Sequence, residues 1–175
     1  EEAFCPQEML DIYKKILARP DVDPGFRSLL GFYMSSPSER AQHIMRCLVD
    51  LDEVRLGHMD ESGIDIQVLA LTSPGVQIMD TDEAVSFARF ANDVLADGIK
   101  RHPSRLVGMT AIAPQSPKEA AKEIQRGVNQ LGIHAAVVNS HTHGEYLSDP
   151  KFWEIFEAAE ALDVPIYLHP NTPPA

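Results

Sequence analysis

The feature that most constrains the fold is an alternation of short apolar runs with helix-spaced apolar stripes. Four runs are mostly apolar without strict alternation of apolar and polar residues: 64–71, 106–113, 134–139 and 164–169. Such runs are typical of strands that are covered on both faces, as in a parallel sheet. The order strand, helix, strand, helix therefore predicts parallel strands joined by right-handed crossovers.

Helical segments separate the predicted strands. Apolar side chains recur at helical spacing over 83–101, 118–131 and 150–162, and these stripes predict helices that pack against the sheet. Two more helices are expected earlier in the chain, over 7–19 and 40–60.

The number of strand–helix units limits which α/β architectures the chain can form. A doubly wound sheet and a (β/α)8 barrel both fit the pattern, and a closed barrel usually takes about 250 residues. The chain has 175 residues and about four units, so it is too short to close a barrel alone. The prediction is an α/β fold in which residues 1–175 form one half of a single domain. Residues 6–35 are predicted to be a helical and loop insertion that covers a site.

Composition narrows the possible partners. The formal net charge of −11 disfavours nucleic-acid binding. No apolar run approaches the roughly 20 residues that span a bilayer, so no membrane partner is expected. The two cysteines, Cys5 and Cys47, have no metal-finger spacing. They indicate reduced thiols, and hence a cytoplasmic location.

Function in parallel α/β folds gathers at the carboxyl ends of the strands. His169 ends the last predicted strand, where a neutral imidazole is well placed to bind a metal. The alternative is a structural histidine bonded to a neighbouring loop. Glu1 and Glu2 stand where a first strand would lie, and on an extended segment their side chains point to opposite faces. One of them could bind a metal, or both could be solvated.

Two further positions suggest substrate contacts. His141 and His143 follow the third apolar run with His-x-His spacing, which leaves metal ligation, substrate contact and a plain loop open. Arg40 falls in the first turn of a predicted helix, where the macrodipole disfavours a cation. Beside free backbone N–H groups it would make a carboxylate-binding corner. It could equally be an exposed arginine paired with Glu39 or Asp11.

The remaining histidines and one cysteine are interpreted as structural. His43, His58, His102 and His134 are expected on the surface or in structural roles, and Cys47 on a helix stripe in the core.

Several motifs together resemble one family, the amidohydrolase-related decarboxylases. The motifs are Glu1-Glu2-Ala3-Phe4, Ser36-Pro37-Ser38-Glu39-Arg40, Leu71-Thr72-Ser73-Pro74-Gly75-Val76-Gln77, Asn139-Ser140-His141-Thr142 and Tyr167-Leu168-His169-Pro170. The family includes decarboxylases of γ-resorcylate, 2,3-dihydroxybenzoate and aminocarboxymuconate semialdehyde. Many members carry histidine where this chain has Ala3. The 5-carboxyvanillate-like branch lacks that histidine too, so the chain is most similar to this branch.

The resemblance implies a (β/α)8 barrel with one divalent metal ion, Mn²⁺ or Zn²⁺, bound by Glu1 and His169. It implies that Arg40 contacts the substrate carboxylate and that Thr72 lines the substrate pocket, beside the candidate contact His141. A later histidine and a final aspartate complete the catalytic set in the family, and both are expected beyond Ala175. The aspartate is a metal ligand and the expected proton donor.

The function implied is metal-dependent, non-oxidative decarboxylation of an ortho-hydroxy aromatic acid in the breakdown of lignin-derived aromatics. The partner would be a small aromatic carboxylate, and the resemblance implies a homo-oligomer, either dimer or tetramer. One alternative is a hydrolase such as a lactonase, or a hydratase, that attacks a ring-cleavage product with metal-activated water. Another is an inactive half-barrel whose unpaired sheet edges favour aggregation.

Overall fold

The computed structural model describes residues 2–173, in which the strands form two parallel three-stranded sheets and one antiparallel pair, β6 (His141–Thr142) with β7 (Glu145–Tyr146). The first sheet has the order β1 (Glu2–Phe4), β2 (Gln67–Leu71), β3 (Leu106–Gly108), and the second has the order β4 (Thr110–Ala111), β5 (Ala136–Asn139), β8 (Ile166–His169). The four apolar runs predicted as strands each contain one of these strands, or two in the case of 106–113.

The two sheets are joined through Met109, which lies between β3 and β4. The Met109 N–H donates to the Leu69 carbonyl at 2.9 Å, while the next N–H, that of Thr110, donates to the Ala135 carbonyl at 2.8 Å. The chain through 106–111 therefore changes partner midway. The strands follow one another in sequence order without reversal, which is the order of a (β/α) barrel wall and not of a doubly wound sheet.

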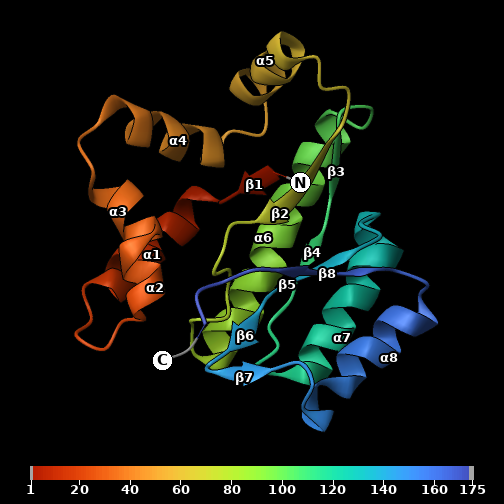
Figure 1. Ribbon diagram of the computed structural model, residues 1–175. Coiled ribbons are helices and arrows are strands. Elements are labelled where there is room, and N and C mark those ends of the chain that lie inside the picture. The colour runs from red at the N-terminus through yellow and green to blue at the C-terminus, as the bar shows by residue number, and fades with distance from the viewer. Residues whose placement is uncertain (1, 174–175) are drawn as a thin grey trace.

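The predicted crossover helices are present. They are α6 (Thr81–Arg101), α7 (Pro117–Arg126) with its π-helical continuation η1 (Gly127–Leu131), and α8 (Trp153–Ala161) after the 3-10 turn η2 (Pro150–Phe152). Figure 1 shows α7 and α8 side by side, next to the strands β4, β5 and β8.

The N-terminal part of the chain is more broken than predicted. It forms α1 (Gln7–Leu17), α2 (Pro24–Ser28), α3 (Leu30–Ser35), α4 (Glu39–Val49) and α5 (Glu53–Ser62). The prediction of one helix over 40–60 was wrong, because the chain breaks at Asp50. Its carboxylate accepts the N–H groups of Asp52 and Arg55 at 3.0 and 2.9 Å and so begins a new helix.

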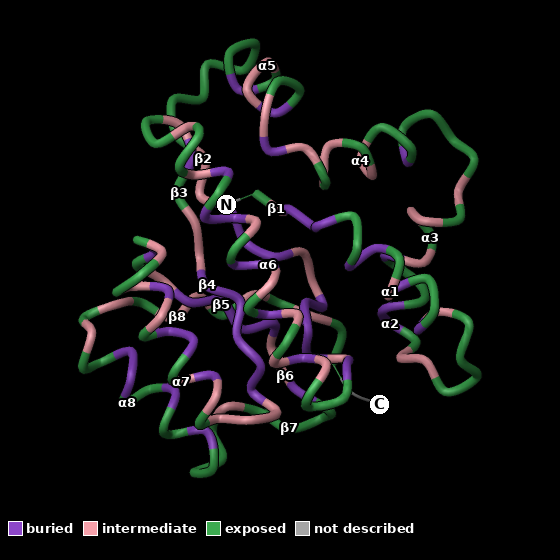
Figure 2. Tube along the Cα trace, turned by 180° about the vertical axis from the view of Figure 1, so that it is seen from behind, coloured by how far each residue is buried: buried purple, intermediate pink, exposed green. Residues whose placement is uncertain are grey.

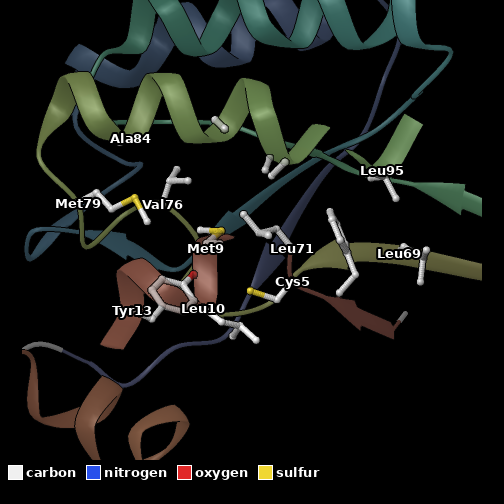
Figure 3. Packing of buried hydrophobic residues seen from close by; sticks show 14 of the residues in the cluster. Cys5, Met9, Leu10, Tyr13, Leu69, Leu71, Val76, Met79, Ala84 and Leu95 are labelled. Atoms are coloured by element: carbon white, nitrogen blue, oxygen red, sulfur yellow. The ribbon is translucent and has the colours of Figure 1, made fainter. Parts of the chain in front are cut away.

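The main core lies between α1, the strands and α6, as Figure 3 shows. Tyr13 of α1 is fully buried and meets the ring of Phe26 edge-on, with 5.2 Å between centroids. A side chain of this size contributes roughly 1.5–3 kcal/mol when it is buried. Burial raises the pKa of Cys5 to about 12, so this cysteine stays a protonated thiol.

A smaller core lies between β5, β8 and the helices α7 and α8. It includes Ile124, Val138, Phe152 and Ile155, with Ile166 packed against it. Figure 2 shows that buried residues concentrate on the strands and on the helix faces turned toward them. None of the helices in residues 2–173 is both long and apolar enough to cross a bilayer.

Candidate active site at the carboxyl ends of the strands

A cavity of about 280 Å³ lies where β1, β2 and β8 meet the helices α3 and α4. Its strand-side lining comes from Ala3, Thr72, Ser73 and His169, and Leu30 and Ile44 are among the residues that line it from the helices. The structure therefore brings together two predicted site residues, Thr72 and His169, that stand 97 positions apart in the sequence.

His169 lies on the inner face of the strand wall. Ile166 packs against the core formed with α7 and α8, and successive side chains of a strand alternate between faces, so His169 faces the other way. Its Nδ1 lies 2.7 Å from the Pro170 carbonyl oxygen. Because a carbonyl only accepts, Nδ1 carries the hydrogen and the ring lone pair is on Nε2. This is the tautomer that metal-binding histidines adopt when a backbone carbonyl orients them.

Thr72 follows the last residue of β2, and its N–H donates to the Phe4 carbonyl at 2.9 Å. The loop that begins here contains a cis peptide bond between Ser73 and Pro74. The Tyr13 hydroxyl donates to the Gly75 carbonyl at 2.8 Å. Burial raises the pKa of Tyr13, so this hydroxyl remains a neutral donor that fixes the loop over the strand ends.

Gln77 ties this loop to the end of β5. Its Nε2 donates to the His141 carbonyl and the Thr142 hydroxyl, both at 2.8 Å, and its Oε1 accepts the Asn139 N–H at 2.6 Å. The residue is buried, so these bonds replace the water that it loses. Sequence reasoning did not assign a role to Gln77, although it ends one of the motifs that carried the family resemblance.

Asn139 is a second residue that sequence reasoning missed. It is the register partner of His169, and its neighbour Val138 packs into the smaller core, so its side chain points to the inner face. The buried Oδ1 has no hydrogen-bond partner among residues 2–173. An unsatisfied buried carbonyl oxygen costs free energy unless another group binds it. Asn139 therefore offers an acceptor next to His169.

Arg40 is exposed on the first turn of α4, which Ser38 caps by accepting the Ala41 N–H at 3.3 Å. Ile44 and Leu48 stand one and two turns further along and line the 280 Å³ cavity. Residues four apart share a helix face, so Arg40 lies on the cavity-lining face, one turn before the lining begins.

His141 lies in a neighbouring cavity of about 530 Å³, which Gln77 and Asn171 also line. Its Nε2 donates to the Thr172 carbonyl at 2.8 Å, and its Nδ1 accepts the Gly144 N–H at 3.3 Å. Both ring nitrogens thus hold the loops after β5 and β8. A contact with substrate stays a prediction for His141, and it would require one of these bonds to open.

Of the two N-terminal glutamates, Glu2 is among the described residues. Glu1 lies outside the described residues. Glu2 begins β1, and its side chain is exposed. That Glu1 and His169 bind the same metal ion therefore stays a prediction.

The amidohydrolase family profile matches residues 23–174. The chain belongs to this family. Within it, the chain is 39% identical over 133 residues to a γ-resorcylate decarboxylase from Polaromonas sp. strain JS666, a match that covers 72% of this chain and 41% of the relative.

Solved structures show the same relationship. The 5-carboxyvanillate decarboxylase of Novosphingobium aromaticivorans, complexed with manganese and 4-hydroxy-3-methoxy-5-nitrobenzoic acid, superposes with a TM-score of 0.96 at 48% identity. The match covers 99% of this chain and 49% of that one. A dihydroxybenzoic acid decarboxylase of Polaromonas sp. JS666, with manganese and 2-nitroresorcinol, gives a TM-score of 0.80 at 33% identity. This match covers 99% of this chain and 48% of that one.

The chain thus spans about half the length of the relatives that it matches. Its consecutive parallel strands correspond to one half of the (β/α)8 barrel of the decarboxylases that it matches, and this half-barrel fold is the one predicted from the sequence.

Proposed function

We propose that residues 1–175 are the N-terminal half of one barrel domain in a metal-dependent decarboxylase. This enzyme removes the carboxylate, without oxidation, from an ortho-hydroxy aromatic acid of the 5-carboxyvanillate type during breakdown of lignin-derived aromatics. The observation that carries the proposal is the cavity that unites Thr72 and His169 at the strand ends. The similarity to decarboxylases of 5-carboxyvanillate and γ-resorcylate supports it.

Among the described residues that line the cavity, His169 supplies the imidazole that could bind a divalent metal ion. With Nδ1 donating to the Pro170 carbonyl, Nε2 of His169 is the nitrogen that would bind the ion, and a carboxylate from Glu1 would complete this chain's share of the ligands. Manganese is the first candidate because the related structures hold it. When bound, the ion supplies Lewis-acid polarisation of substrate oxygens. Zinc, a cytoplasmic location and a homo-oligomeric state stay predictions.

The cavity suits one aromatic ring. Its volume of about 280 Å³ is close to the lower end of the roughly 300–1,000 Å³ of small-molecule sites. Apolar walls from Leu30 and Ile44 would contact the ring, and Thr72 supplies a hydroxyl at the polar end. Arg40, one helical turn before the lining residue Ile44, would hold the carboxylate through charge-assisted hydrogen bonds and so fix its orientation. The insertion over residues 6–35 would cover the bound ring.

The reaction needs a proton on the ring carbon that bears the carboxylate. As the bond to the carboxylate breaks, its electron pair returns to the ring and carbon dioxide leaves. The resemblance assigns the proton donor to an aspartate beyond Ala175. The roles left to this half of the barrel are binding, orientation and exclusion of water.

Product analysis tests the proposal. A protein that extends past Ala175 would be incubated with 5-carboxyvanillate, γ-resorcylate and 2,3-dihydroxybenzoate, and separately with aromatic lactones. Release of carbon dioxide with the ring intact is the expected result. Uptake of water without carbon dioxide would contradict it and favour a hydrolase or hydratase.

A further inference from the structure

Two histidines and a cysteine meet between α4 and α5. His43 and Cys47 are four residues apart on α4, and therefore share one helix face, and His58 reaches them from α5. The Cys47 Sγ lies 3.5 Å from Nε2 of His43 and 3.9 Å from Nδ1 of His58, and the three ligand atoms all lie within 4.8 Å of one another. The roles predicted for these residues, surface or structural for the histidines and core for Cys47, do not account for this convergence.

We propose that His43, Cys47 and His58 form a binding site for a zinc-type divalent transition metal. A tetrahedral zinc ion with usual bond lengths holds its sulfur and nitrogen ligands about 3.6 Å apart and two nitrogens about 3.3 Å apart. The two sulfur–nitrogen separations already come close to this geometry. Both imidazoles are exposed, so rotation of their side chains can bring the nitrogens together. Thiolate and imidazole are ligands that bind zinc well, whereas harder cations such as Mg²⁺ prefer oxygen ligands.

The surroundings leave room for an ion and a fourth ligand. The three side chains line a cavity of about 400 Å³, and Glu2 lies on the same wall. A site with three protein ligands completes its tetrahedron with a carboxylate or water.

Arg55 fixes the backbone that carries the ligands. Its Nη2 donates to the carbonyls of Cys47 and Ala3, both at 3.0 Å, and its Nε donates to the Asp50 carbonyl at 2.8 Å. Burial lowers the pKa of Arg55, an effect that the charges of Glu2 and Asp50 oppose. The guanidinium is thus committed to the junction between α4 and α5. This arrangement sets the angle between the two ligand-bearing helices before any metal binds.

Cobalt substitution tests the site directly. The protein is stripped with a chelator and titrated with Co²⁺, which reports a cysteine ligand by thiolate-to-cobalt charge transfer in the near ultraviolet. Among the described residues, no cysteine lines the cavity at His169, so a metal bound there does not produce this thiolate signal. We expect about one equivalent of the signal, and its loss in Cys47→Ser. Cys5→Ala should retain it, because the Cys5 thiol is buried in the core.

Substitution of the two histidines is the second test of the site. His43→Asn and His58→Asn should each weaken Co²⁺ and Zn²⁺ binding by at least the roughly 10–100-fold that loss of an outer-shell partner costs. His134→Asn, at an exposed histidine elsewhere, should leave binding unchanged. Zn²⁺ should raise the melting temperature of the wild type by more than that of Cys47→Ser. A folded wild type without the charge-transfer signal at excess Co²⁺ would overturn the proposal, as would a signal that neither histidine variant changes.

Discussion

The side-chain carboxamide of Gln77 forms two hydrogen bonds with the backbone of Asn139, one as acceptor and one as donor. Its Oε1 accepts the Asn139 N–H at 2.6 Å, and its Nε2 lies 3.3 Å from the Asn139 carbonyl oxygen. One buried carboxamide thus joins the loop after β2 to the end of β5, next to the register partner of His169. This connection holds the loop after β2 against the end of β5, beside the candidate site.

Replacing Gln77 should therefore destabilise the fold. Gln77→Ala leaves the buried Asn139 N–H and Thr142 hydroxyl without their partner, at a cost of roughly 2–4 kcal/mol in the free energy of unfolding. Urea denaturation measures this change. Gln125→Ala, at an exposed glutamine of α7, is the control and should shift stability by no more than about 0.5 kcal/mol. Equal effects of the two substitutions would contradict the structural role.

Replacing two glycines in helical segments by alanine should change the stability of the fold in opposite directions. At Gly127 an added Cβ would lie 2.3 Å from the Thr110 Oγ1, whereas at Gly57 it meets nothing within 4 Å. Gly127→Ala should cost about 1–3 kcal/mol through overpacking. Gly57→Ala should stabilise by about 0.5–1 kcal/mol, because alanine favours the helix. Thermal melts of both variants check the signs, and stabilisation by Gly127→Ala would show that η1 and β4 are not in this contact.

Acid stability should depend on Asp52. Its hydrogen bonds with Arg101 at 2.8 and 3.0 Å, and then with His102, lower the pKa of its carboxyl. The contribution to stability is therefore complete above the unfolded-state pKa of about 3.9 and is lost as the pH falls through the lower folded-state pKa. Because the side chain is half exposed, the effect should be no more than about 1 kcal/mol.

Asp52→Asn tests this pH dependence. The variant should be less stable than the wild type near neutral pH, and the difference should shrink as the pH falls below about 4. Asp65→Asn is the control, since Asp65 forms no ion pair within residues 2–173. A stability difference that does not change with pH would contradict the assignment.

Substrate affinity should depend on Arg40. In a protein that extends past Ala175, Arg40→Gln removes a charge-assisted contact worth about 1.5–3 kcal/mol, so KM should rise roughly 10–150-fold. Arg46→Gln, on a different face of the same helix, should change KM little. Steady-state kinetics with 5-carboxyvanillate distinguish the two, and equal KM values would place Arg40 outside the binding site.

The sequence predicted the architecture because its signals are local. The strand β5, within the apolar run 134–139, is buried along its whole length, and stripes such as 83–101 have one helical period. Neither signal depends on distant residues. The helix break at Asp50 was not predicted, because the apolar period continues across this residue. The break arises because the Asp50 carboxylate accepts backbone N–H groups in place of helical carbonyls.

The site was only partly predictable for a related reason. His169 and Thr72 stand at strand ends, a position that parallel topology alone marks as functional. Gln77 and Asn139 are 62 residues apart, and no local pattern links them. The spacing of His43 and Cys47 does signal a shared helix face, but the approach of His58 depends on the break between α4 and α5.

The most direct test of the central claim is metal content measured together with carbon dioxide release in a protein that extends past Ala175. We expect manganese-dependent release of carbon dioxide from 5-carboxyvanillate, and loss of both bound manganese and activity in His169→Asn but not in His134→Asn. Full activity of His169→Asn, or release of carbon dioxide by metal-free protein, would contradict it.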